Sequence, residues 1–274
     1  MRLLGPACWL LGRLRYAQKF VVIAVALLAP LSFATYAYVT AQDAQIAFSA
    51  KERQGVAYIA PLGDLLIEAV GARAAAVAGD QGRLAAAGQA VAAATAQVDR
   101  VDARLGRGLG VDGAWAKVKA SLGVIGRTQA SPQQTLDAYD QASQGVGDLM
   151  VQAADGSNLT LDPDLDSFYV MDATTTKIPA LADSLGHAGD LQHLRGRTAV
   201  AERQRVARLA VARGTIASTL DGLGRDLRTA FAATGHGGLR PTLQPSSTAR
   251  PVGCRRPPPR WAPPLPRPPA KPVP

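Results

Sequence analysis

The chain has 274 residues, a formal net charge of +9, two cysteines and few aromatic residues. Residues 1–19 carry four basic and no acidic side chains, residues 240–274 carry seven basic and no acidic ones, and the remaining positions hold 19 of the 30 Lys and Arg residues against all 21 acids. The body is therefore close to neutral, which argues against a nucleic-acid partner. Cys8 and Cys254 lie on either side of this body, so it has no internal disulfide.

The first predicted element is an apolar run, Phe20 to Val39. At about 1.5 Å per residue, a helix of this length crosses a hydrocarbon core of about 30 Å. The run follows the basic residues 1–19, and acids appear only after it, from Asp43 onward. This asymmetry keeps the N-terminus in the cytoplasm. We expect a single-pass protein of the bacterial inner membrane, with a cytoplasmic segment 1–19, a transmembrane helix 20–39 and its bulk extracytoplasmic.

A cleaved signal peptide is the alternative, because Val39-Thr40-Ala41 places small residues near a cleavage position. The apolar run exceeds the usual core of about 7 to 15 residues, and the basic segment before it is long, so we favour a retained anchor. A mature chain that begins at Gln42 would contradict the anchor.

Apolar residues recur at spacings of three and four from residue 41 onward, as amphipathic helices require. The first helix continues out of the membrane, and Pro61 kinks it without ending it. Gly79 and Gly82 mark the turn that follows this helix. A second helix covers residues 84–105, and residues 106–126 form a glycine-rich connection with a helical turn around Trp115. Two arginines on these helices, Arg73 and Arg83, are expected to be solvated.

The next helix has a clear start, because Ser131-Pro132-Gln133-Gln134 combines an N-cap, a proline at the first helical position and a capping-box glutamine. Gly156 ends it, and Asp162-Pro163 opens another helix. A turn is expected over residues 186–190, followed by a last long helix with an inner face that includes Val206 and Leu220. The fold class is all-α: an antiparallel helical bundle over residues 41–237.

The segment 238–274 differs in composition, because 13 of the 19 prolines fall between Pro241 and Pro274. A segment this rich in Pro and Arg is predicted to be disordered or polyproline-like. Acidic residues vanish after Asp226, and we interpret the tail as a frameshift product. A genuine proline-rich interaction tail is the alternative.

No nucleophile elbow, Walker loop or metal-spaced pair is present, so the sequence predicts neither an enzyme nor a cofactor or metal site. His187, His193 and His236 are too scattered for zinc. Polar side chains that should face a neighbouring helix are the candidates for binding a small anion or a polar metabolite between helices. The alternative is that they fix the ends of the bundle through hydrogen bonds and ion pairs. These candidate ligand-binding residues are Arg53, Tyr58, Asp166, Tyr169 and Asp172.

Two segments carry a resemblance to a known family: Lys51-Glu52-Arg53-Gln54-Gly55-Val56-Ala57-Tyr58-Ile59-Ala60-Pro61-Leu62, and Asn158 to Asp172 running on to Lys177-Ile178-Pro179. In this order after a membrane helix, they resemble the periplasmic sensor region of bacterial methyl-accepting chemotaxis proteins. The resemblance spans about residues 13 to 238. It implies a homodimeric helical-bundle sensor between two spans, then a HAMP linker and a cytoplasmic coiled coil.

The chain departs from that family at its C-terminus, where it carries neither a second span nor a signalling module. The expected function is therefore the extracytoplasmic ligand-sensing domain of a chemoreceptor, truncated before its second span. Similar input domains of histidine kinases or diguanylate cyclases are an alternative. A single-span scaffold protein with a proline-rich tail is another.

Overall fold

The computed structural model describes residues 15–161, 164–194, 198–235 and 237–243. Helices make up nearly all of this part of the chain, and no strand occurs in it. Its elements are α2 (Tyr16–Ala78), α3 (Gln81–Leu109), α4 (Asp112–Ser121), a 3-10 turn (Leu122–Val124), α5 (Pro132–Gly156), a second 3-10 turn (Leu159–Leu161), α6 (Leu165–Asp172), a π-helical segment (Ala173–Lys177), α7 (Ile178–His193), α8 (Ala199–Ala233) and α9 (Leu239–Leu243).

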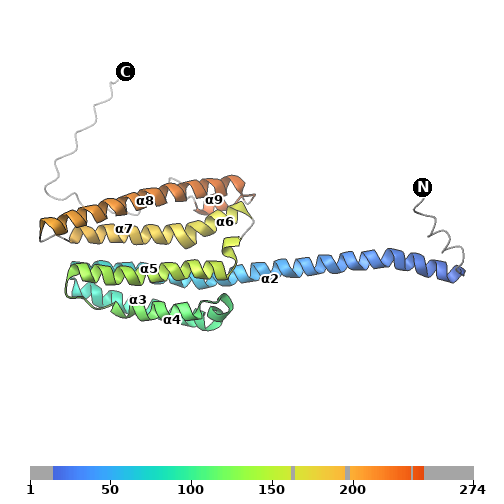
Figure 1. Ribbon diagram of the computed structural model, residues 1–274, viewed down its shortest axis with the longest axis horizontal. Coiled ribbons are helices and arrows are strands. Elements are labelled where there is room, and N and C mark those ends of the chain that lie inside the picture. Colours follow the sequence, from blue (N-terminus) through green and yellow to red (C-terminus); the bar gives the residue numbers. More distant parts are fainter. Residues whose placement is uncertain (1–14, 162–163, 195–197, 236, 244–274) are drawn as a thin grey trace, which may run out of the picture. The chain divides into compact units, whose positions relative to one another are not determined.

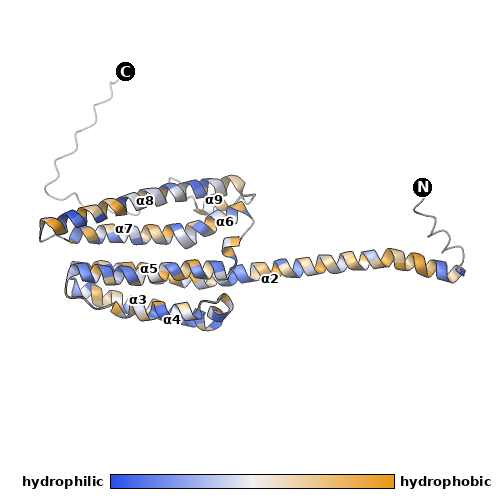
Figure 2. Ribbon diagram, viewed as in Figure 1, coloured by the Kyte–Doolittle hydropathy of each residue, from blue (hydrophilic) through white to orange (hydrophobic). Residues whose placement is uncertain are grey.

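The longest element is α2, with 63 residues. Its first half is exposed and strongly apolar (Figure 2), and it is the one helix among the described residues that is long and apolar enough to cross a membrane. Its second half enters the bundle, and the helix continues through Pro61, as the sequence predicts. One unbroken helix therefore links the apolar half to the bundle.

Capping residues define the helix ends. Oγ of Ser131 accepts a hydrogen bond of 3.2 Å from the Gln134 amide, and Pro132 is the first residue of α5, which confirms the predicted start. Gly79 closes α2 with a φ of 70°, a left-handed conformation that glycine adopts without strain. Asp80 then caps α3 by accepting from the Arg83 amide.

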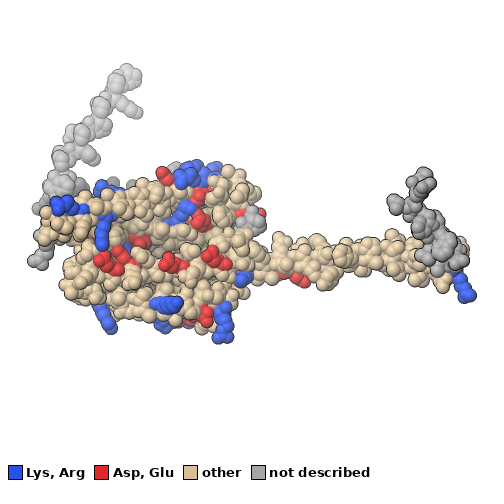
Figure 3. All heavy atoms as spheres, viewed as in Figure 1, with Lys and Arg blue, Asp and Glu red and all other residues tan. Residues whose placement is uncertain are grey.

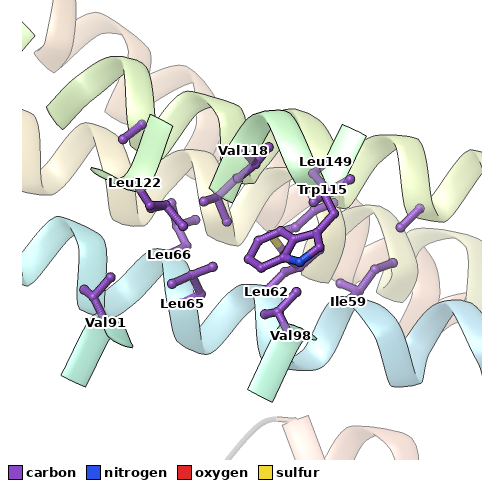
Figure 4. Close-up of a cluster of buried hydrophobic side chains, with 14 of the residues drawn as sticks. Ile59, Leu62, Leu65, Leu66, Val91, Val98, Trp115, Val118, Leu122 and Leu149 are labelled. Atoms are coloured by element: carbon purple, nitrogen blue, oxygen red, sulfur yellow. The ribbon is translucent and has the colours of Figure 1, made fainter. Parts of the chain in front are cut away.

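Helix α2 packs against three other helices, α3, α5 and α7 (Figure 1). Helices α3 and α5 pack against α2, α7 packs on another side of it, and α8 covers α6 and α7. The main apolar core lies among α2, α3, α4 and α5, where the Trp115 ring is surrounded by aliphatic side chains (Figure 4). The indole Nε1 of Trp115 donates to Oδ1 of Asp99 at 2.9 Å, so its polar atom is satisfied.

Four sequence predictions about the helices need correction. The connection predicted over residues 106–126 is mostly helical, because α3 runs on to Leu109 and α4 covers Asp112–Ser121. No turn occurs over residues 186–190, because α7 runs on to His193. The predicted inner face of the last helix is wrong at Val206 and Leu220, which are about half exposed, since α8 turns small residues such as Ala212 toward its neighbours. Within the predicted disordered tail, α9 is helical; it belongs to a second unit that begins at Thr234. Residues 244–274 lie outside the described part, as do Asp162 and Pro163.

Candidate functional site

Arg73 lies at the centre of a buried charge network. It sits in the last turns of α2, and none of its side chain is exposed. Its Nε donates to Oδ2 of Asp190 at 2.7 Å, and its Nη1 donates to Oδ1 of Asp140 at 2.7 Å and of Asp183 at 2.6 Å. Its Nη2 donates to the backbone oxygen of Asp183 at 3.0 Å. One guanidinium thus joins α2 to α5 and α7.

The expectation that Arg73 is solvated is therefore wrong, although Arg83 is exposed as expected. Burying a guanidinium requires compensating charge, and here three carboxylates from 67 to 117 residues away in the sequence supply it. Sequence reasoning missed these carboxylates, because one charged residue on a helix gives no indication of such distant partners.

Two further residues of α7, His187 and Gly186, adjoin the charge network around Arg73. Nδ1 of His187 lies 2.8 Å from Oδ2 of Asp140, the oxygen that Arg73 does not use. Gly186 faces α2, and a Cβ atom there would lie 2.4 Å from Val70 Cγ1 and 2.8 Å from Arg73 Nη2. Glycine is needed at this position for close helix packing, not for a turn.

The carboxylates outnumber the guanidinium. Burial by itself would lower the pKa of Arg73, but the charges of Asp183 and Asp140 outweigh it and raise the pKa above its usual value. Burial raises the pKa of Asp190, and the hydrogen bond from Arg73 only partly offsets this. With three acids around one guanidinium, the network attracts further positive charge.

A cavity of about 490 Å³, here called the His187 cavity, adjoins this network between α5, α7 and α8. Its volume falls in the range of small-molecule sites. Figure 3 shows acidic side chains gathered along the middle of the bundle. The residues that line the cavity include Asp137, Asp140, Gln144, Asp183, Ser184, His187, Arg208 and Thr215.

A second cavity of about 610 Å³, the Arg53 cavity, lies where α2 enters the bundle. Most of its lining is apolar, with side chains such as Val56, Ile59 and Met171. Arg53 is the only one of the five predicted ligand-binding residues that lines it. Glu52 lines it beside Arg53, so the charges of this cavity do not select an anion.

The other predicted residues do not join Arg53 in one site. Tyr58 is fully buried, and its hydroxyl donates to Oδ1 of Asp102 on α3 at 2.8 Å. Burial, followed by this hydrogen bond to Asp102, raises the pKa of the Tyr58 phenol strongly. Tyr58 therefore serves as a core contact between α2 and α3.

On α6, Oδ1 of Asp166 accepts from the Ser167 amide at 2.9 Å, and the Tyr169 ring lies edge-on to Phe168. Asp172 forms an ion pair with Lys177, whose Nζ also lies 2.7 Å from Oδ2 of Asp226 on α8. The Asp172–Lys177–Asp226 contacts reach from α6 to α8, as the alternative expects, whereas these contacts of Asp166 and Tyr169 are with adjacent residues of α6.

The described residues contain no group of three His, Cys, Asp or Glu side chains arranged to hold a metal ion. The chain matches no protein-family model, no curated protein and no solved structure. What the fold defines is an all-helical protein with one helix near its N-terminus that is a candidate to span a membrane.

Proposed function

We propose that the chain is the extracytoplasmic ligand-sensing domain of a chemoreceptor-type protein, anchored in the bacterial inner membrane by residues 20–39 with its N-terminus in the cytoplasm. A small molecule binds between helices of the bundle and changes their packing. The change passes along α2 to the membrane. A homodimer, as in the family it resembles, lets paired helices move against one another.

The continuity of α2 carries this proposal. The same helix contains the apolar run and, in its last turns, Arg73, which holds acids of α5 and α7. A ligand that competes for these acids alters contacts made directly by α2. No loop intervenes between Arg73 and the apolar half, so a displacement is not absorbed on the way.

The packing of α8 supports the proposal that this helix moves when a ligand binds. Only Ala212, Gly222, Asp226 and Ala230 of this 35-residue helix are buried. Few buried contacts are typical of elements that open or shift at low free-energy cost. Because α8 forms one wall of the His187 cavity, a ligand there contacts both the firmly held α5 and the weakly held α8.

Two alternatives share this geometry. An input domain of a histidine kinase or a diguanylate cyclase would use the same bundle and differ only in its output. A scaffold protein would need the anchor and the tail but no ligand.

Distance measurements between spin labels test the proposal on the full chain in lipid nanodiscs, with Cys8 and Cys254 replaced by serine. One label pair joins exposed positions of α2 and α8, Ile67→Cys and Ser218→Cys. The control pair joins α2 to α3, Ile67→Cys and Gln89→Cys, across the main core. We expect a panel of amino acids, amines and organic acids to contain a compound that shifts the first distance and not the second. Unchanged α2–α8 distances across the whole panel would favour the scaffold alternative.

A further inference from the structure

The Arg53 cavity combines an apolar lining with access from outside. Val56 of α2 is 57% exposed, although it belongs to the half of that helix that lies in the bundle. Ala60 and Gly63 of α2 are accessible as well, and Val170 and Met171 of α6 are partly exposed in the facing wall. Apolar side chains that surround a hollow and stay accessible are typical of a ligand-binding site.

The charges of the lining do not favour an ion as the ligand. Among the described residues that line the cavity, Glu52 and Arg53 are the only ionisable ones, and they contribute one negative and one positive charge. A charged ligand would lose hydration on entry and would meet an attractive and a repulsive charge together. An uncharged ligand has no such hydration to lose.

The hydroxyl groups in the wall formed by α6 and the π-helical segment are already used. Oγ of Ser167 donates to the Asp164 carbonyl at 3.1 Å. Oγ1 of Thr174 and Oγ1 of Thr175 each donate to the Met171 carbonyl at 2.9 Å. Because a hydroxyl has a single proton to donate, a carboxylate or carbonyl group of a ligand finds no hydroxyl donor on this wall. The wall therefore also favours an apolar ligand.

Methionine makes the cavity adaptable to a flat ring. Two of the chain's three methionines are in the lining: Met171, which is partly exposed, and Met150, which is buried beneath it. The thioether side chain is flexible and polarisable, and its sulfur makes favourable contacts with aromatic rings. The cavity volume of about 610 Å³ is sufficient for a naphthalene-sized molecule.

We propose that the Arg53 cavity binds a small uncharged aromatic molecule, which lies between Val56 on α2 and Val170 and Met171 on α6. Water in this hollow meets few polar partners, so its displacement by an apolar ring favours binding. The ligand class follows from the cavity alone. Its meaning as a signal rests on the proposed sensor function, because the ligand contacts α2 and α6 together.

The position of the cavity along α2 gives such a ligand a short route from the membrane. Ser49 is the lining residue next along α2 from the apolar run, and it follows Val39 by ten residues. At about 1.5 Å per residue, the two lie about 15 Å apart along the helix axis. An apolar compound that concentrates in the lipid therefore reaches the cavity without a long passage through water.

Equilibrium dialysis of the full chain in nanodiscs tests the site, with naphthalene as the probe and empty nanodiscs to correct for its partition into lipid. The anionic and cationic controls are 2-naphthoate and 2-naphthylmethylammonium. We expect saturable binding of naphthalene and about tenfold weaker binding of both ions, since the lining favours neither sign of charge.

Two pairs of variants locate the probe. Gly63→Phe fills the cavity, because nothing lies within 4 Å of a Cβ at this position, and Gly71→Phe adds the same ring at an open position of α2 outside the lining. Val56→Asn makes the wall polar, whereas Ile67→Asn changes a residue of matched exposure, 56%, outside the lining. We expect Gly63→Phe and Val56→Asn to weaken naphthalene binding about tenfold and their controls to leave it unchanged.

Absence of saturable binding beyond partition into lipid, tighter binding of 2-naphthoate, or equal affinities in Gly63→Phe and Gly71→Phe would each overturn the assignment. If naphthalene does not bind and the chain forms a dimer that Val56→Asn dissociates and Ile67→Asn does not, a second copy occupies this face instead. Naphthalene binding that leaves the α2–α8 label distance unchanged would confirm the site and contradict its role as a signal.

Discussion

Arg73 on α2 and Asp190 on α7 lie 117 residues apart in the sequence, yet Nε of Arg73 and Oδ2 of Asp190 are 2.7 Å apart in the structure. This pair and the contacts of Arg73 to Asp140 and Asp183 tie three helices together at the end of the bundle that is remote from the apolar half of α2. The bundle end is thus held by charge as well as by apolar packing.

Replacing Arg73 with methionine leaves three carboxylates without their shared cation. We expect the free energy of unfolding to fall by about 3 to 5 kcal/mol, the usual effect of breaking a buried ion pair. Urea unfolding followed by circular dichroism measures this. The matched variant Arg83→Met changes an exposed arginine of α3 and should stay within about 0.5 kcal/mol of the parent. Equal effects of the two variants would mean that the network contributes no stability.

Two glycines of α7 should respond oppositely to alanine. In Gly186→Ala the new Cβ meets Val70 and Arg73 at less than 3.0 Å, so overpacking lowers the free energy of unfolding by about 1 to 3 kcal/mol. In Gly189→Ala nothing lies within 4 Å, and alanine stabilises the helix by about 0.5 to 1 kcal/mol. Thermal melts of both variants compare them. A loss in both would show that Gly189 also faces a neighbour.

Two buried tyrosines should make the fold sensitive to alkali. Burial raises the pKa of the Tyr58 and Tyr139 phenols, and the Tyr139 hydroxyl also donates to the Arg127 carbonyl at 2.9 Å. Because both pKa values are raised in the folded state, the unfolded chain releases these protons first. Stability present below the usual tyrosine pKa of about 10 is therefore lost as the pH rises above it.

Ultraviolet titration measures this effect. The phenolate absorbance of Tyr58 and Tyr139 should appear only together with unfolding, and Tyr58→Phe or Tyr139→Phe should each remove one phenol from that late step. Full ionisation of both groups while the helical circular dichroism is intact would contradict the burial.

The native cysteines report the membrane topology, because Cys8 precedes the apolar run and Cys254 follows the bundle in the sequence. In intact spheroplasts, an impermeant maleimide should label Cys254 and reach Cys8 only after the membrane is permeabilised. Cys8→Ser and Cys254→Ser identify each signal. Labelling of Cys8 in intact spheroplasts would contradict the proposed topology. A mature chain starting at Gln42 would show a cleaved signal peptide.

The sequence was sufficient for the helical class and for several helix ends. Ser131 with Pro132 starts α5 and Gly79 ends α2, because caps are local signals. Gly156 is the last residue of α5 but not its cap, which is Ser157; a Cβ at Gly156 would lie 2.2 Å from the Leu109 carbonyl oxygen. Gly186 misled the prediction, since glycine in a helix that packs closely against another looks like a turn residue until its neighbour is known. The site was less predictable, because Asp140, Asp183 and Asp190 acquire their role only when the fold brings them to Arg73.

Because α2 is unbroken, it fixes the direction in which the bundle faces, that is, its rotation about the axis of the apolar half of α2. Each residue of an α-helix advances about 1.5 Å and turns about 100°. One alanine inserted between Asp43 and Ser49 would therefore rotate the Arg73 face by about 100° about that axis, while seven would return it to within about 20° of its starting direction. Any surface that the bundle presents to a second copy is set by the number of residues in this stretch as strictly as by their identity.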